Sequence, residues 1–251
     1  MKRFLLAALA ASLALTPTAL SGVRGYQFAP AYRPDTPRVP QADVGSYDGI
    51  HKVAVLSAIG MRFDLQDQGA LETKNGTLDV AAWRLDDKVE AAVRRELGGR
   101  FTFADVPYER AKLAPLRADT QHLASFEAFL KSVPAAGVDA FIVVRPEADG
   151  GLALQTATSR NTILWTSFEI DVVDAHSLKV IAKSTARVNP PQASHPNFPG
   201  LVVGKEFQLD RSLAVSSEKQ EKLRFLTEEL LNVTLAETIR SLRFGSPAAG
   251  E

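Results

Sequence analysis

The four histidines are the first residues to consider as catalytic or metal-binding groups, and they are widely separated along the chain. They are His51, His122, His176 and His195, and no two lie within four residues of each other. A zinc site needs three or four donors that converge on one ion, and this spacing supplies no such group. His195 lies in a proline-rich stretch and is the one histidine that we keep as a candidate ligand. We interpret the other three as surface residues.

The carboxylates and serines show no arrangement typical of acid–base or nucleophilic catalysis. Asp86 and Asp87 are adjacent at a predicted helix start, where acidic residues suit the helix dipole. Asp171 and Asp174 form a candidate pair near a predicted hairpin tip, although solvated strand ends explain them more simply. Ser57 ends a predicted buried strand, the place where α/β proteins hold ligands, but the sequence shows no neighbouring base for it. The common nucleophile-elbow, zinc-protease, phosphate-loop and dinucleotide-binding motifs are missing.

A third candidate is an interaction surface centred on Trp165. This residue shares a strand face with Glu169 and Asp171, so the pattern predicts a solvent-exposed tryptophan. Tryptophan is enriched among the residues that anchor protein–protein interfaces. An equally weighted alternative is that a proline-rich segment covers the ring. His195 and Phe198, in the proline-rich stretch that follows, complete the candidate interface.

The elements that must position these residues alternate between strands and helices. Near-continuous apolar runs at 52–59 and 140–144 predict strands buried on both faces. Apolar residues three and four apart predict helices at 86–98 and 125–133, with a short strand at 101–106 between them. This order predicts an α/β domain with a mixed α+β sheet, in two or three layers.

The second half of the chain predicts an antiparallel hairpin and a long helix. Residues 162–188 alternate between apolar and polar types, which predicts a hairpin with one core face and one wet face. We expect the carboxylates of the wet face to pair across the strands with Lys179 and Lys183. An irregular excursion at 189–215 has the length of functional or mobile loops. Residues 217–242 carry a wide apolar stripe that predicts a helix packed on the sheet.

Local signals add a turn and two helix caps to this outline. The dipeptide Asn75-Gly76 is typical of a hairpin or other tight turn. Asp87 with Glu90, and Ser217 with Gln220, have the spacing of capping boxes at the starts of the first and last helices.

The N-terminus has the layout of an export signal. Lys2 and Arg3 precede an apolar run at 4–15, and small residues offer a cleavage site after Ser21. An uncleaved N-terminal anchor is the alternative. We expect four segments: a signal peptide at 1–21, a proline-rich tether at 22–48, a single domain at 49–244 and a disordered tail at 245–251. Nothing after Ser21 approaches an 18-residue apolar stretch, so we expect no transmembrane span in the mature chain.

Composition narrows the compartment and the partners. Basic and acidic residues number 29 each, so the chain has no excess positive charge for binding nucleic acid. Because the chain contains no cysteine, it can form no disulfide, no thiolate metal site and no lipid attachment at an N-terminal cysteine. We expect a periplasmic or secreted protein without cofactors.

Three segments carry a resemblance to a group of bacterial envelope proteins. The strand at 52–56, the small-small-x-Gly-x-Asp-Ala entry at 135–144 and the hairpin at 168–182 resemble those of two kinds of protein. These are the amino-terminal domain of the Tol-Pal translocation protein TolB, and the curli-secretion and peptidoglycan-synthase-activator lipoproteins. The likeness covers most of 50–242, but the lipid-anchor cysteine of several relatives is missing, and the 189–215 stretch departs from them. The resemblance implies a non-catalytic periplasmic module that contacts other envelope proteins.

Two hypotheses of function follow from the sequence. The first is a non-catalytic interaction module of the periplasm, whose partners are other envelope proteins, with self-association as a further option. The second is a small-molecule- or metal-binding protein, with a hydrolase included, that uses His195 and nearby carboxylates. The second hypothesis predicts a concave pocket lined by converging polar groups beside His195.

Overall fold

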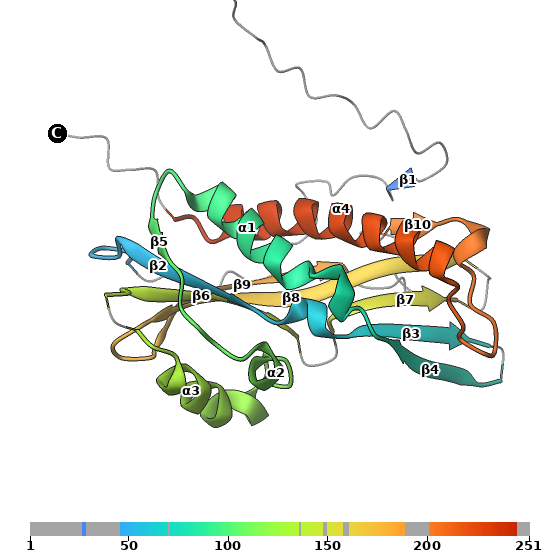
Figure 1. The fold of residues 1–251 in the computed structure, drawn as a ribbon, viewed down its shortest axis with the longest axis horizontal. Helices are drawn as coiled ribbons and strands as arrows, with labels where there is room; N and C mark the ends of the chain where they lie inside the picture. Colours follow the sequence, from blue (N-terminus) through green and yellow to red (C-terminus); the bar gives the residue numbers. More distant parts are fainter. Residues whose placement is uncertain are drawn as a thin grey trace, which may run out of the picture.

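The sheet of this protein is mixed and has helices on both faces (Figure 1). The computed structural model describes residues 27–28, 46–69, 71–135, 137–147, 150–157, 161–188 and 201–244. The strands are β1 (Gln27–Phe28), β2 (Lys52–Ser57), β3 (Phe63–Gln68), β4 (Thr73–Leu78), β5 (Thr102–Ala104), β6 (Ala140–Pro146), β7 (Leu152–Thr156), β8 (Thr162–Asp174), β9 (Val180–Val188) and β10 (Leu201–Val203). The helices are α1 (Leu85–Leu97), α2 (Arg110–Leu113), α3 (Leu123–Ser132) and α4 (Ser217–Ser241). The predicted fold class, including the hairpin at 162–188 and the long last helix, is confirmed.

Strand β8 runs through the whole sheet, while its neighbours are each made of two shorter strands. On one edge of β8, β6 pairs with residues 168–174 and β7 with residues 162–166. On the other edge, β9 pairs with residues 166–173 and β10 with residues 162–164. The next strands outward are divided in the same way, because β2 pairs with β6 and β3 pairs with β7, both in parallel. The sheet therefore consists of two halves that share one uninterrupted strand.

The neighbouring strands are interrupted at a common level of the sheet, near Ser167. The chain between β2 and β3 covers residues 58–62, and the chain between β6 and β7 covers residues 147–151. Gly150 lies so close to β8 that a Cβ atom on it would be 2.5 Å from the Cβ of Ser167. Only glycine fits this approach, so the chain can pass this close to β8 at Gly150.

The larger hydrophobic core lies on the upper face of the sheet, as oriented in Figure 1, beneath α1 and α4. Val55, Ile142 and Val172 sit side by side on β2, β6 and β8 and point to this face. Leu230 and Ile239 of α4 belong to the same core. The predicted packing of the last helix on the sheet is therefore confirmed.

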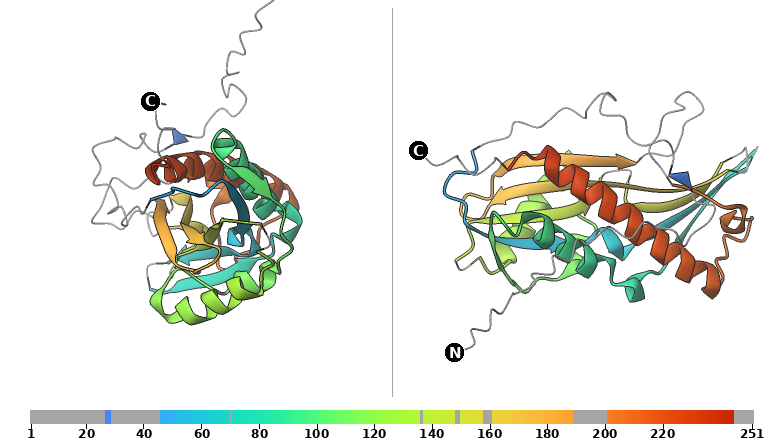
Figure 2. Two further views of the ribbon diagram at one scale, coloured as in Figure 1. Left: turned by 90° about the vertical axis from the view of Figure 1, so that its left-hand side faces the viewer. Right: turned by 90° about the horizontal axis from the view of Figure 1, so that it is seen from above.

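A smaller core lies on the lower face, beneath β2 and β6. Leu56, Phe141 and Val143 pack there against Phe126 and Phe129 of α3. Figure 2 shows the sheet between the two helical layers, with α1 and α4 on one side and α3 on the other. Helix α3 covers only the half of the sheet that contains β2 and β6 (Figure 1).

The hairpin of β3 and β4 turns at a different place from the one predicted. Its turn lies at 69–72, where the Gly69 amide donates to the Glu72 carbonyl at 2.9 Å. Asn75 and Gly76 lie inside β4 and pair with β3. The glycine makes room for another segment, because a Cβ on Gly76 would be 2.8 Å from Cδ1 of Leu213.

Both predicted capping boxes are wrong in detail. The N-cap of α1 is Arg84, in the left-handed conformation and without a side-chain cap, and Asp87 lies inside the first turn. The N-cap of α4 is Ser216, one residue before the predicted Ser217, and its hydroxyl accepts from the Lys219 amide. Hydroxyl acceptors at this position satisfy one of the free amides of the first turn.

The remaining segment predictions lie mostly outside the described residues. This holds for the signal peptide at 1–21 and for the tail at 245–251. Within the predicted tether, Gln27–Phe28 pair with Leu201 and Val202 of β10, so this part of the tether forms a sheet ladder. Among the described residues, no helix combines the length and the apolar character that crossing a bilayer requires.

Candidate functional site

A row of buried side chains on the lower face of β8 contains Trp165 and Asp171, two of the residues singled out from the sequence. The row is formed by Trp165, Ser167, Glu169 and Asp171, which alternate with residues of the upper core. Their exposed fractions are only 6%, 3%, 7% and 1% respectively. The prediction of a wet face is therefore wrong. The strand lies in the middle of the sheet, and neighbouring strands supply a polar partner that the alternation pattern does not reveal.

Arg145 of β6 is that partner. Its Nε donates to Asp171 Oδ2 at 2.7 Å, and its Nη2 lies 3.5 Å from Glu169 Oε1. A further N–H donates to the Arg117 carbonyl at 3.0 Å. The guanidinium also lies over the Phe126 ring, 3.9 Å from its centroid. With an exposure of 2%, Arg145 is a buried cation held by carboxylates, a carbonyl and a ring face.

The row contains two carboxylates, but only one buried cation, Arg145 of β6, lies beside them. Asp171 Oδ1 is buried and has no hydrogen-bond partner. Burial, together with the charge and hydrogen bonding of neighbouring Asp171, raises the pKa of Glu169 to about 7, although Lys183 and Arg145 act against this rise. Lys183 of β9 is half-exposed, and its Nζ lies 3.5 Å from Glu169 Oε2. Of the predicted cross-strand pairs, Lys183–Glu169 therefore forms, whereas Asp171 binds Arg145 instead.

The same row is connected to the interruption between β6 and β7. The Ser167 hydroxyl donates to the Glu147 carboxylate. Arg117 donates to the carbonyls of Glu147 and Gly150, at 3.1 and 2.7 Å. These contacts hold Glu147 and Gly150 against β8, next to the ionic cluster.

Trp165 is buried, so the prediction of an exposed anchor at this position is wrong. Its Nε1 has no hydrogen-bond partner, and neither has Oε1 of Gln155 on the adjacent strand β7. Ala153 and Gln155 pair with Trp165 and Ile163, which places the tryptophan and the glutamine on the same face as diagonal neighbours. A donor and an acceptor are thus left unpaired near each other in the interior.

The other two residues of the predicted interface, His195 and Phe198, lie outside the described residues. The segment that contains them leaves β9 at Val188, beside Thr166, and re-enters the sheet at Leu201, beside Leu164. Its two ends therefore lie on either side of Trp165 along one edge of β8. A pocket beside His195, which the second hypothesis requires, falls outside the described residues as well.

A second polar cluster lies on the upper face, at the end of β2. The Ser57 hydroxyl donates to Asp86 Oδ1 at 2.6 Å, and the Gly60 amide donates to the same oxygen at 3.0 Å. Burial raises the pKa of Asp86, while the hydrogen bonds from Ser57 and Gly60 oppose the rise. Sequence reasoning missed this partner of Ser57. The contact joins the end of β2 to the start of α1, which is a structural role.

Tyr108 extends this cluster toward the protein surface. Its hydroxyl accepts from the Ser57 amide at 2.8 Å and lies 2.5 Å from Glu90 Oε1, to which it donates. Burial and the neighbouring Glu90 raise the pKa of this hydroxyl. Arg110 binds Glu90 at 2.8 Å and Asp87 at 2.6 Å. Arg110 is therefore the cation that Asp87 and Glu90 share, whereas Asp86 accepts from the neutral donors of Ser57 and Gly60.

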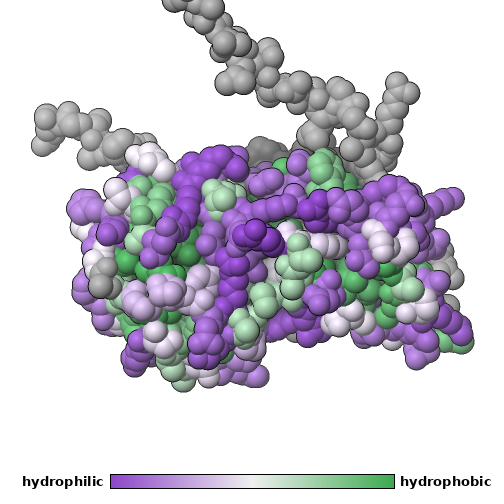
Figure 3. Space-filling model, viewed as in Figure 1, coloured by the Kyte–Doolittle hydropathy of each residue, from purple (hydrophilic) through white to green (hydrophobic). Residues whose placement is uncertain are grey.

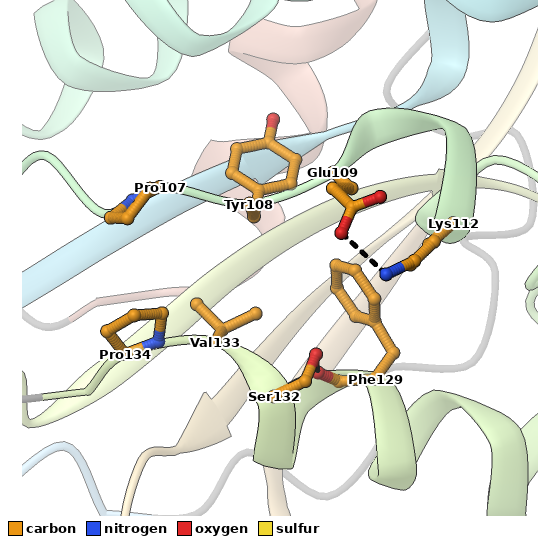
Figure 4. A pocket seen from close by; sticks show the side chains of 8 residues that line it. All are labelled: Pro107, Tyr108, Glu109, Lys112, Phe129, Ser132, Val133 and Pro134. Atoms are coloured by element: carbon orange, nitrogen blue, oxygen red, sulfur yellow. Dashed lines mark hydrogen bonds and ion pairs between the residues drawn. The ribbon is translucent and has the colours of Figure 1, made fainter.

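Below Tyr108 lies an open groove of about 310 Å³ between α2 and the end of α3 (Figure 4). It is lined by Pro107, Tyr108, Glu109, Lys112, Phe129, Ser132, Val133 and Pro134. The walls are two aromatic rings, two proline rings and a valine, and Lys112 binds Glu109 at 2.5 Å at the rim. Figure 3 shows hydrophobic residues around α3, next to strongly hydrophilic ones.

The remaining candidate residues take part in local structure. The imidazole Nδ1 of His122 lies 2.7 Å from Asp119 Oδ1, at the start of the turn before α3. Asp174 accepts from the backbone amides of His176 and Ser177 in the β8–β9 turn. Asp171 and Asp174 point to opposite faces of β8, so they do not form the candidate carboxylate pair, and Asp171 is buried rather than solvated. Within the described part of the chain, no three histidine or acidic side chains are placed to hold a metal ion.

Comparisons with known proteins find only a distant structural likeness. No family model matches the chain, and no curated protein matches it. One solved structure that matches is a protein from Xanthomonas campestris of the DUF330 family, with 14% sequence identity and a TM-score of 0.30. The match covers 84% of this chain and 94% of that protein. A likeness at this TM-score carries no functional inference.

Proposed function

We propose that this chain is a non-catalytic periplasmic protein of the cell envelope that binds other envelope proteins through the groove between α2 and α3. The proposal joins the export-signal layout of the N-terminus to the resemblance that the sequence bears to envelope modules. The observation that carries it is the groove itself, which offers apolar rings rather than convergent catalytic groups.

The lining of the groove favours an extended segment that contains proline. Such segments take up the polyproline II conformation and bind to grooves lined by aromatic side chains. The Tyr108 and Phe129 rings meet edge to face, with centroids 6.5 Å apart, and Pro107 and Pro134 extend the apolar wall. Because Glu109 and Lys112 neutralise each other at the rim, the groove does not require a charged ligand.

Photo-crosslinking tests this occupant directly. Benzoyl-phenylalanine at position 132, at the rim of the groove, should crosslink in intact cells to one defined peptide. Mass spectrometry should identify that peptide as a proline-containing segment of an envelope protein. Residues 30–41 of this chain itself, which carry prolines at 30, 34, 37 and 40, are one such segment.

The matched control carries the same photo-reactive residue at position 124. Ala124 is exposed on α3 but does not line the groove. Equal crosslinking from both positions, or a crosslinked peptide without proline, would contradict the proposed docking site. In addition, Ser132→Tyr should weaken binding of the identified peptide at least tenfold, while Ala124→Tyr leaves it unchanged.

The proposed compartment has its own test. N-terminal sequencing of the native protein from a periplasmic extract should give Gly22 as the first residue. Recovery from the cytosol with Met1 at the N-terminus would remove the envelope assignment, whatever the groove binds.

A further inference from the structure

The buried row on β8 has more carboxylates than buried cations beside it, and the proposed function does not involve this excess of acidic groups. Glu169 and Asp171 follow each other on the same face of one strand, and both are buried. The charged groups that face Glu169 from the described side chains are Arg145 on β6, Asp171 on β8 and Lys183 on β9. Arg145 is the only one of the two cations that is buried.

The unpartnered oxygen of Asp171 indicates how the imbalance is resolved. Asp171 Oδ2 already accepts from Arg145, while the buried Oδ1 has no donor. A buried acceptor without a donor is costly. Glu169 is the neighbouring side chain on the same face of β8, and Arg145 contacts both carboxylates, with Nε on Asp171 Oδ2 and Nη2 near Glu169 Oε1. If Glu169 carries a proton, it becomes the donor that Asp171 Oδ1 lacks.

We propose that Glu169 and Asp171 form a proton-binding site, in which a proton on the Glu169 carboxyl is donated to Asp171 Oδ1 and is released as the pH rises. Proton release leaves two buried anions against one buried cation. The half-exposed Lys183 then becomes the only further cation within 4 Å among the described side chains. The site therefore makes the β6–β8–β9 region sensitive to pH.

The sign of this dependence follows from proton linkage. The pKa of Glu169 is raised in the folded state, from 4.5 to about 7. The folded state therefore binds this proton more tightly than the unfolded state does. The resulting stabilisation is complete below about pH 4.5 and is lost as the pH rises through about 7. This loss lowers the ratio of folded to unfolded protein on the order of a hundredfold.

Carboxyl-detected NMR of the unmodified protein gives the direct test. The Glu169 side-chain carboxyl carbon should titrate with a midpoint near pH 7. A midpoint between 4 and 5 would overturn the proposal. This measurement needs no variant and is independent of whether the groove binds a peptide.

A pair of variants tests the consequence for stability. Glu169→Gln keeps a hydrogen-bond donor for Asp171 but removes the titration. Its melting temperature should match that of the unmodified protein at pH 5 and exceed it at pH 8.5. The control Glu72→Gln makes the same chemical change at an exposed position in the β3–β4 turn, and its curve should follow the unmodified protein throughout. If Glu169→Gln also follows the unmodified protein at every pH, no such proton is bound.

Discussion

The two buried polar clusters lie on opposite faces of the same sheet and are completed in different ways. On the upper face, a single oxygen of Asp86 accepts from a serine hydroxyl and from a backbone amide. On the lower face, Glu169 and Asp171 depend on one buried guanidinium, that of Arg145, and one Asp171 oxygen has no donor. The upper cluster is thus satisfied by neutral donors, and the lower one by charge.

This difference teaches what each cluster contributes. In the upper cluster, Asp86 matters mainly because its Oδ1 accepts the hydrogen bonds of Ser57 and Gly60, and its charge is secondary. In the lower cluster, the balance of charges decides stability, because buried ions that lose their counter-ion are very unfavourable. Substitutions that remove a charge but keep the acceptor atom should therefore have a small effect in the upper cluster and a large one in the lower cluster.

The largest effect is expected from Arg145→Met. This change leaves Glu169 and Asp171 as two buried carboxylates without a buried counter-ion, and should lower the free energy of unfolding by about 3–5 kcal/mol at pH 8. Urea denaturation measures it. The control Arg62→Met removes an exposed arginine from its ion pair with Asp64, and should cost less than about 1 kcal/mol. Equal losses in both variants would show that the buried ion pairs of Arg145 stabilise the fold no more than an exposed ion pair does.

A smaller effect should follow from Asp86→Ala. The Ser57 hydroxyl and the Gly60 amide would both lose their acceptor, and each buried donor left unpaired costs about 1–3 kcal/mol. Asp86→Asn retains an amide oxygen where Oδ1 accepts both hydrogen bonds, so we expect it to be much less destabilising. Denaturation of the two variants side by side would show whether acceptor or charge matters; a similar loss in both would favour charge.

The smallest effect is expected from Lys183→Met at pH 6. Glu169 is then largely protonated, and a half-exposed lysine contributes about 0–1 kcal/mol to such a pair. At pH 8.5 the loss should increase, because Glu169 is then an anion that lies 3.5 Å from Lys183. Melting curves at the two pH values provide the comparison. An equal loss at pH 6 and pH 8.5 would show that the contribution of Lys183 does not depend on the protonation of Glu169.

The fold could be predicted from the sequence because its elements are strongly periodic. The apolar runs that form β2 and β6 and the amphipathic patterns of α1 and α4 mark the ends of these elements to within two residues. The turn of the first hairpin was misplaced, because Asn75-Gly76 is a strong local turn signal. At this position the glycine accommodates Leu213, which is distant in sequence.

The candidate site was less predictable, because it depends on which strands are neighbours. Alternation along β8 indicates two faces but not what covers them. Arg145 offered a signal that sequence reasoning did not use, since a charged residue closes an apolar strand buried on both faces. Such a residue requires a buried counter-charge, and Glu169 and Asp171 are the buried carboxylates of β8 that pair with β6.

The continuity of β8 has a consequence for how the domain unfolds. Its 13 residues carry hydrogen bonds to both halves of the sheet, whereas the strands beside it are divided. If one half of the sheet unfolded alone, β8 would lose the hydrogen bonds to that half. Because the other half also depends on β8, the two halves should unfold together. Amide hydrogen exchange should consequently show equal protection at both ends of this strand, even where the flanking connections exchange quickly.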